Sequence, residues 1–303
     1  MSQRNQQVRD INGVVLLDKA SGSSSNHVLQ QVKRLFGANK AGHTGSLDPL
    51  ATGLLPICFG QATKVAQFLL DDDKRYLVHA KFGQVSSTGD SEGKVVNFGS
   101  TKGINESSIR TILSQFIGDI NQVPPMYSAL KRNGTPLYKL ARKGIEIERS
   151  PRPVTIHEIN FLDLEETVAS LEVFCSKGTY IRTLVEDIGK SLGCGGHVVE
   201  LRRTGFAHLD LSGSKTYEQL SKLKEQNIES LDSVILSADE MLPNLKSVYL
   251  DSEQTRDIRL GKKIEYLGFS ASHKLKLYDH NKQFLGIGES NPMSEILPKR
   301  LFV

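Results

Sequence analysis

The sequence of 303 residues has few cysteines and no long apolar stretch, and these absences exclude several classes of protein. Its three cysteines are Cys58, Cys175 and Cys194, and no CxxC pair occurs. An odd, scattered set argues against a disulfide framework and a zinc site, and indicates buried, reduced thiols in a cytoplasmic protein. No run approaches the roughly 20 apolar residues of a membrane helix. The polar start MSQRNQQVRD does not resemble a secretory signal.

Positive charge is concentrated in one part of the chain. The whole sequence carries a formal net charge of only +4. In residues 123–153, however, seven basic residues accompany two acidic ones, which gives this segment a charge of +5. Such a concentration favours a polyanion and steers its approach, but a solvated basic surface would have the same composition. Charge alone leaves both interpretations open.

Hydrophobic patterning predicts strands mixed with helices up to about Asp210, and therefore an α+β body. The expected strands are residues 13–18, 76–82 and 171–175. The expected helices begin after caps at Ser24 or Ser25 and at Asn105, end at Gly37 and Gly118, and also cover residues 62–70 and 180–192.

Two further regions differ in texture from this body. Residues 123–153 form a long, basic segment rich in proline and glycine, and such loops are usually functional or disordered. From Lys246 onward the segments are short, and LKLYD and FLGIG flank HNKQ as an expected hairpin. We therefore predict a catalytic domain over residues 1–245, with an insertion at about 123–153, and a small β-rich domain over 246–303.

The loop AGHTGSLDPLATGLLP, residues 41–56, presents a single aspartate, Asp48, among glycines and threonines. Glycine permits close approach to a ligand, and Pro49 stiffens the chain directly after the carboxylate. The sequence has neither a phosphate-binding GxxxxGK[ST] motif nor a GxGxxG fingerprint, and no third metal ligand accompanies His43 and Asp48. Asp48 is thus a candidate catalytic carboxylate, or it only closes an Asx-turn.

A second candidate region, KGTYIR, joins an expected strand to an expected helix and contains Tyr180 and Arg182. An arginine beside Asp48 would hold the carboxylate ionised and fix its orientation. An aromatic ring there could stack on a base. The alternatives are a surface ion pair for Arg182 and a core position for Tyr180.

These motifs together closely resemble a known family. The run GHTGSLDPLATGLLP, with LLDKASGSSSN before it and KRY after it, is similar to the bacterial tRNA pseudouridine-55 synthases, the TruB family. VPPMYSALKRNGTPLYKLARKGIEI, GTYIRTLVEDIG and HVVELRRTGF match the same family in the same order. The resemblance runs from about Gly13 to Phe206. Ala20 and Ser46 depart from the usual proline and the frequent alanine at their positions.

The resemblance implies a role for individual residues. Asp48 falls on the catalytic aspartate, Arg182 on its arginine partner, and Tyr76 on a tyrosine that stacks on the target base and takes part in proton transfer. Tyr180 and Leu201 fall on the uracil pocket, and His43 on a histidine that stabilises the rearranged T-loop. We expect contacts with the RNA backbone from Lys19, Lys131, Arg132, Arg142 and Lys143.

The resemblance also implies a fold and a reaction. The fold would be a mixed-sheet pseudouridine synthase domain with a PUA-like RNA-binding domain at the C-terminus. The reaction would convert uridine 55 in the T-loop of tRNA to pseudouridine by base flipping, without cofactor, metal, membrane or obligatory protein partner. Two alternatives stay open, a guide-RNA-dependent pseudouridine synthase and a tRNA-folding chaperone in which isomerisation is incidental.

Overall fold

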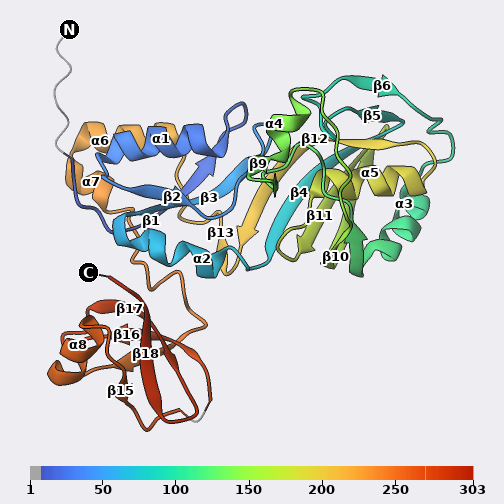
Figure 1. Ribbon diagram of the computed structural model, residues 1–303. Helices are drawn as coiled ribbons and strands as arrows, with labels where there is room; N and C mark the ends of the chain where they lie inside the picture. The colour runs from blue at the N-terminus through green and yellow to red at the C-terminus, as the bar shows by residue number, and fades with distance from the viewer. Residues whose placement is uncertain (1–7, 270, 303) are drawn as a thin grey trace.

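A nine-stranded mixed sheet runs through most of the computed structural model, which describes residues 8–269 and 271–302 (Figure 1). Along the sheet the order is β1 (Gly13–Lys19), β3 (Thr52–Phe59), β12 (Gly196–Phe206), β4 (Lys74–Phe82), β11 (Val168–Cys175), β10 (Arg152–Glu165) and β7 (Gly118–Gln122). Two short strands complete it, because β2 (Ala41–His43) pairs with β3 and β13 (Leu209–Asp210) pairs with β12.

The contact between β3 and β12 is the one parallel pairing in this sheet, and it joins the sheet's two halves. Gly53 stands opposite Arg203 there, at a φ of 99°. A Cβ atom on Gly53 would lie 2.2 Å from the Arg203 carbonyl oxygen, so only glycine permits this approach. The loop that contains Asp48 ends directly at this junction.

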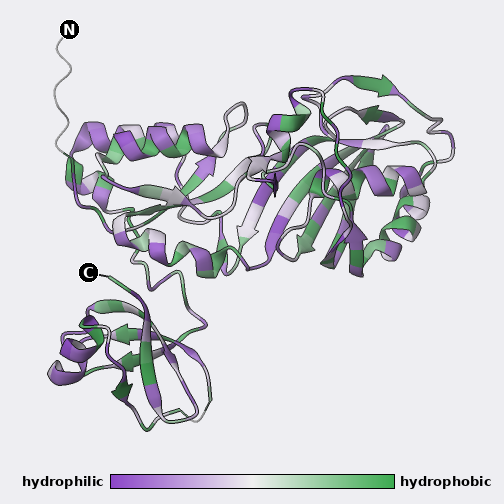
Figure 2. Cartoon of the chain, viewed as in Figure 1, coloured by the Kyte–Doolittle hydropathy of each residue, from purple (hydrophilic) through white to green (hydrophobic). Residues whose placement is uncertain are grey.

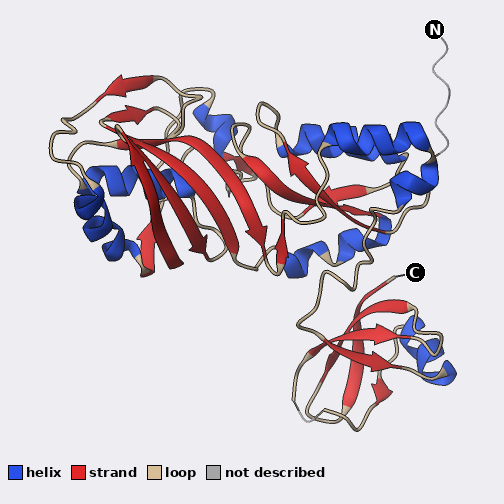
Figure 3. Cartoon of the chain, turned by 180° about the vertical axis from the view of Figure 1, so that it is seen from behind, coloured by secondary structure: helices blue, strands red, loops and turns tan. Residues whose placement is uncertain are grey.

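Helices cover the sheet in two groups, which the view from behind also separates (Figure 3). One group packs near β1 and β3: α1 (Ser25–Phe36), η1 (Gly60–Lys64), α2 (Ala66–Leu69), α6 (Tyr217–Gln226) and α7 (Ile228–Asp232). The other packs near β10 and β12: α3 (Glu106–Leu113), η2 (Ser114–Phe116) and α5 (Ile181–Ser191).

The alternation predicted for residues 76–82 is confirmed in β4. Tyr76, Val78, Ala80 and Phe82 are buried on one face and join the main hydrophobic core, whereas the residues between them are more exposed. Figure 2 shows bands of hydrophobic and hydrophilic residues along the strands of the sheet. One face of β4 therefore packs against the layer of α5, and this face contains Tyr76.

The 123–153 segment contains secondary structure of its own. A short hairpin, β8 (Lys131–Arg132) and β9 (Thr135–Pro136), leads into α4 (Leu137–Ala141), and Leu137 is buried. The expectation of a loop-rich excursion is therefore only partly met for residues 123–153.

A second hairpin, β5 (Gln84–Ser86) and β6 (Val95–Asn97), lies outside this segment and follows β4.

A separate five-stranded sheet forms the β-rich C-terminal part, in the order β14 (Lys246–Tyr249), β16 (Lys274–Tyr278), β17 (Phe284–Ser290), β18 (Glu295–Leu301) and β15 (Ile264–Glu265), with α8 (Ser252–Arg259) beside it. The predicted hairpin is confirmed as β16 and β17. The Tyr278 hydroxyl donates to Asp239 Oδ2 at 2.7 Å, and Lys64 Nζ donates to the Leu301 carbonyl at 2.7 Å. These contacts attach the smaller sheet to the larger body.

Several local predictions are confirmed, and one helix ends slightly earlier than expected. Helix α1 has its N-cap at Ser24 and its C-cap at Gly37, as expected, and all three cysteines are buried and free. The helix expected to end at Gly118 stops slightly earlier, because α3 ends at Leu113, η2 continues to Phe116, and Gly118 opens β7. In the described part of the chain, no helix combines the length and the apolarity needed to cross a membrane.

Candidate active site

Asp48 lies in the loop between β2 and β3, and α1 fixes the backbone just before it. The Ser25 hydroxyl donates to the Leu47 carbonyl at 2.9 Å and accepts from the Leu47 N–H at 2.7 Å. Ser25 is buried, so this exchange satisfies both of its hydrogen-bonding functions. The loop is therefore held rigidly at the residue that precedes the carboxylate.

Lys19 holds the other side of the same loop. Its ammonium group donates to the carbonyls of Ala20, Pro49 and Ala51 at 2.8, 3.2 and 2.7 Å. Lys19 is only 1% exposed, and burial lowers its pKa to about 8. All three donors of Lys19 are thus used inside the protein, and its contact with the RNA backbone stays a prediction.

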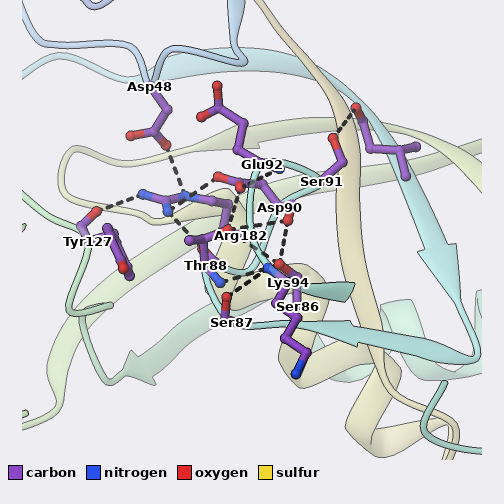
Figure 4. Close-up of polar contacts among 11 residues, drawn as sticks. Asp48, Ser86, Ser87, Thr88, Asp90, Ser91, Glu92, Lys94, Tyr127 and Arg182 are labelled. Carbon is purple, nitrogen blue, oxygen red and sulfur yellow. Dashed lines mark hydrogen bonds and ion pairs between the residues drawn. The ribbon is translucent and has the colours of Figure 1, made fainter. Parts of the chain in front are cut away.

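Arg182 brings the two regions singled out in the sequence together (Figure 4). Its Nε lies 2.9 Å from Asp48 Oδ2. Its Nη1 donates to the Thr88 carbonyl at 2.8 Å, and its Nη2 donates to the Tyr127 carbonyl at 2.8 Å. The side chain is 5% exposed, so its orientation is set by these contacts. Asp48 thus faces a fixed cation, as the sequence led us to expect.

A second carboxylate, Asp90, contacts the same guanidinium and was not found from the sequence. Asp90 Oδ2 lies 3.4 Å from Arg182 Nη1, and the side chain of Asp90 is 3% exposed. Its Oδ1 accepts from the Thr88 hydroxyl at 2.5 Å and from the Glu92 N–H at 3.1 Å. Arg182 is therefore shared between a buried carboxylate and the partly exposed Asp48 (Figure 4). In the sequence, Asp90 is only an acidic residue in the turn STGDSEG, and nothing in this turn indicates a contact with Arg182.

Burial raises the pKa of Asp48 above its ordinary value, and Arg182 and Lys19 only partly oppose this effect. The negative charge of Asp90 raises it further. The side chain of Asp48 nevertheless keeps 39% of its surface exposed, so substrate can reach it. Arg182 favours the ionised form of Asp48, in the expected direction, but desolvation is the larger effect on its pKa.

Tyr76 lies on β4 and belongs to the hydrophobic core, and the negative charge of Asp48 raises its pKa. It is 9% exposed, and burial raises its pKa to about 12. Leu201 on β12 stands opposite Val78, two residues from Tyr76, and is 7% exposed. Asp48, Tyr76 and Leu201 therefore come from one loop and two paired strands that meet at the β3–β12 junction.

Tyr180 is the N-cap residue of α5, and its backbone is held by a side chain that the sequence did not indicate. The Gln122 amide accepts from the Tyr180 N–H at 3.0 Å and donates to the Tyr180 carbonyl at 3.3 Å. Gln122 is 1% exposed. Burial raises the pKa of Tyr180, and the charge of Asp48 contributes to the same shift. The ring of Tyr180 is thus within electrostatic reach of Asp48.

His43 lies on β2, before the loop that contains Asp48, and burial and the positive charge of Arg203 both lower its pKa. The ring is therefore neutral at pH 7, and its buried Nδ1 has no hydrogen-bond partner within the described residues. Lys131, Arg132, Arg142 and Lys143 are exposed, on or next to β8 and α4. Among residues 8–269 and 271–302, no three His, Cys, Asp or Glu side chains cluster as metal ligands.

The geometry combines one accessible carboxylate, a fixed arginine and two tyrosines. A carboxylate held by a guanidinium can attack a carbon centre or stabilise a developing cation, and a phenol can exchange a proton. The exposed edge of Asp48 and the aromatic rings around it suit a flat substrate whose reacting atom approaches the carboxylate.

Comparison with known proteins adds an independent finding. The family model "TruB family pseudouridylate synthase (N terminal domain)" matches residues 33–181, and two C-terminal models of the same family match 182–243 and 247–302. The tRNA pseudouridine synthase B of Actinobacillus pleuropneumoniae is 50% identical and covers 99% of both chains. That of Haemophilus influenzae strain KW20 is 50% identical over 95% of this chain and 92% of its own.

Solved structures show the same architecture at lower identity. A chain from an H/ACA RNP bound to a substrate RNA containing 2'-deoxyuridine has a TM-score of 0.73 and 21% identity, and covers 96% of this chain and 85% of its own. A chain from a Cbf5-Nop10-Gar1 complex has a TM-score of 0.71 and 24% identity, and covers 96% and 82%. This likeness concerns the fold, and it confirms the predicted α+β class with a mixed sheet and a β-rich C-terminal domain.

Proposed function

Since this chain belongs to the TruB family of pseudouridylate synthases, we propose that it isomerises uridine 55 in the T-loop of tRNA, with Asp48 as the catalytic carboxylate. Family membership makes the protein a pseudouridine synthase, an isomerase. The assignment to tRNA follows the names of its relatives. The observation that carries the role of Asp48 is its 2.9 Å contact with the buried Arg182, beside a surface that substrate can reach.

The reaction balances without an added reagent. The bond between C1′ and N1 of uracil breaks, the base turns, and a new bond forms between C1′ and C5. The hydrogen on C5 then leaves as a proton to restore the double bond, and N1 gains a proton. Asp48 either bonds covalently to the substrate or assists elimination of the base, and both routes need an ionised carboxylate. Tyr76 is the group we assign to removal of the C5 proton.

The target base has to leave its stack before this chemistry can occur. Flipping costs a few kcal/mol, which stacking and a fitted pocket offset. We assign the base-contacting surface to Tyr76, Tyr180 and Leu201, and the support of the opened T-loop to His43, whose neutral ring suits stacking.

RNA binding is assigned to regions outside the pocket. The exposed residues Lys131, Arg132, Arg142 and Lys143 in the 123–153 insertion would contact phosphates. We divide the chain into a catalytic domain of residues 1–245 and a PUA-like RNA-binding domain of 246–303, and place the protein in the cytoplasm. The basic insertion would let the protein recognise its own RNA. We therefore expect the protein to bind the T-arm of tRNA without an obligatory protein partner.

The decisive experiment uses purified protein and an unmodified tRNA transcript, with carbodiimide primer extension to locate pseudouridine. We expect modification at position 55 with the wild type and no product with Asp48→Asn, whose tRNA affinity should be unchanged. Asp48→Asn keeps the shape of the side chain and removes its charge. Folded wild-type protein that binds tRNA without modifying it would refute the stand-alone enzyme and favour a guide-dependent synthase or a chaperone.

A further inference from the structure

Arg203 is a buried cation in the candidate site, and among the described residues it has no carboxylate as an ion-pair partner. The residue is 1% exposed, and no Asp or Glu of the described chain lies within ion-pair distance of it. Buried charges are normally paired, because an isolated charge loses its hydration without compensation. The groups that do surround this guanidinium should therefore show what its charge is for.

Three parts of the candidate site meet at Arg203. Its Nε donates to the Leu54 carbonyl of β3 at 2.8 Å, and its Nη2 donates to the Gly45 carbonyl, three residues before Asp48, at 3.2 Å. On β12 it stands directly opposite Tyr76 of the paired strand β4, and both side chains are buried. One side chain thus joins the catalytic loop, the strand that follows it and the proposed base.

The charges around Tyr76 show how Arg203 affects the ionisation of this phenol. Burial raises the pKa of Tyr76, and Asp48 from the loop and Cys175 from β11 act in the same sense. The positive charge of Arg203 acts in the opposite sense and lowers the pKa of this phenol. Its positive charge also lowers the pKa values of Lys74 on β4 and His43 on β2, and so disfavours further cations nearby.

We propose that Arg203 is a positioning residue: the carbonyls of Gly45 and Leu54 hold its guanidinium beside Tyr76, where its charge stabilises the phenolate during proton removal. The inference rests on the proposed function, in which Tyr76 accepts the C5 proton. Tyr76 releases its own proton to solvent, and the phenolate then takes the proton from C5. The electron pair of the C–H bond stays in the ring, and Arg203 keeps its own proton throughout.

The charge of Arg203 and its hydrogen bonds to the Leu54 and Gly45 carbonyls can be separated by two variants. Arg203→Met keeps most of the alkyl volume and removes both, whereas Arg203→Lys keeps the charge and loses the fork that reaches Leu54 and Gly45 together. Arg202→Met is the matched control for the ionisation of Tyr76. It removes the neighbouring arginine on the same strand, which pairs with Asp18.

The first readout is the ionisation of Tyr76 itself. A fluorinated tyrosine installed at position 76 reports its own titration by fluorine NMR in the full-length protein. We expect the titration to move to higher pH by about one unit or more in Arg203→Met, a tenfold weaker acid. The shift should be smaller in Arg203→Lys and absent in Arg202→Met. An unchanged titration in a folded Arg203→Met protein would refute the proposal.

The second readout is single-turnover pseudouridine formation at saturating tRNA. We expect Arg203→Met to lose about 100-fold or more, as when one positioned donor is removed from a catalytic site, with unchanged tRNA affinity. Arg203→Lys should regain part of this rate, and more of it at high pH. A loss that appears only in tRNA affinity would contradict the role. If Arg203→Met does not fold, Arg203→Lys still tests the link through both readouts. The NMR arm needs no activity, so it separates failure of this inference from failure of the proposed function.

Discussion

At the scale of single residues, Asp48 is governed by two opposing effects. Burial and the charge of Asp90 raise its pKa, and Arg182 and Lys19 lower it, with burial the largest contribution. A carboxylate in this position is a stronger base than one in water. It stays reactive only while the adjacent cations keep it ionised.

This balance predicts the acid side of the pH–rate profile. The proposed mechanism needs ionised Asp48, so the rate should fall as pH drops through its raised pKa. That fall should lie above the value of about 3.9 found for a free aspartate. Single-turnover rates between pH 4 and 8 at saturating tRNA would measure it. A rate that stays constant down to about pH 4 would contradict the raised pKa.

Removing the positive charge of Arg182 should move the acid limb of the pH–rate profile to still higher pH. In Arg182→Gln the guanidinium charge is lost while Asp90 remains, so the pKa of Asp48 should rise again. We expect the acid limb to shift to higher pH and the plateau rate to fall, because Asp48 also loses its orienting contact. An acid limb at the wild-type position would show that Arg182 does not control the ionisation of Asp48.

The residues of the site differ in how far sequence alone could predict them. Asp48 was found because its loop is locally unusual in glycine, threonine and proline. Asp90 and Arg203 were missed because their contacts depend on chain pairing, and Arg203 lies 149 positions from Leu54, whose carbonyl it contacts. Local composition carries no information about such pairing.

At the scale of elements, the start of α5 depends on the end of β7. Gln122 satisfies the backbone N–H of Tyr180 from a strand 58 positions earlier. The same residue directly precedes the 123–153 insertion. The position of Tyr180 is therefore coupled to the base of the segment that we assign to RNA binding.

Replacing Gln122 with leucine should expose this coupling. The Tyr180 N–H would lose its acceptor, which costs about 1–3 kcal/mol in the free energy of unfolding. The pocket would also shift, and small displacements can cost about 100-fold in rate. Urea denaturation and single-turnover assays measure both. Asn121→Leu is the matched control, because Asn121 is exposed on the same strand. Equal effects of both substitutions would rule out the coupling.

Element boundaries show where local signals fail. For α1, the cap predicted at Ser24 or Ser25 is Ser24, and the predicted end at Gly37 is confirmed, since both signals act within one helical turn. Gly118 comes two residues after the helical run of α3 and η2, and it also opens β7, which pairs with β10. No element was predicted between Asp210 and Pro243, where α6 and α7 bury only Leu220 and Leu231. Helices with so narrow an apolar face leave a weak periodic signal.

At the scale of the whole molecule, charge distribution separates chemistry from RNA binding. The cations of the site are buried and bound to protein groups, as Lys19, Arg182 and Arg203 show. The cations of the insertion are exposed. The fold class and the excess of basic residues in the insertion could be predicted from the sequence. The sequence could not predict which basic residues are exposed. Lys19, for example, is a lysine like those of the insertion, but it is buried.

This separation predicts how salt affects RNA binding. Arg142→Gln combined with Lys143→Gln removes two exposed charges, and each lost phosphate contact should reduce the slope of log affinity against log salt by about 0.7–0.9. The rate at saturating tRNA should not change, since neither residue contacts the site. Filter binding over a range of KCl concentrations measures the slope. Lys102→Gln with Lys222→Gln, two exposed lysines outside the insertion, is the matched control. Equal slopes for both pairs would mean that the insertion is only a solvated surface.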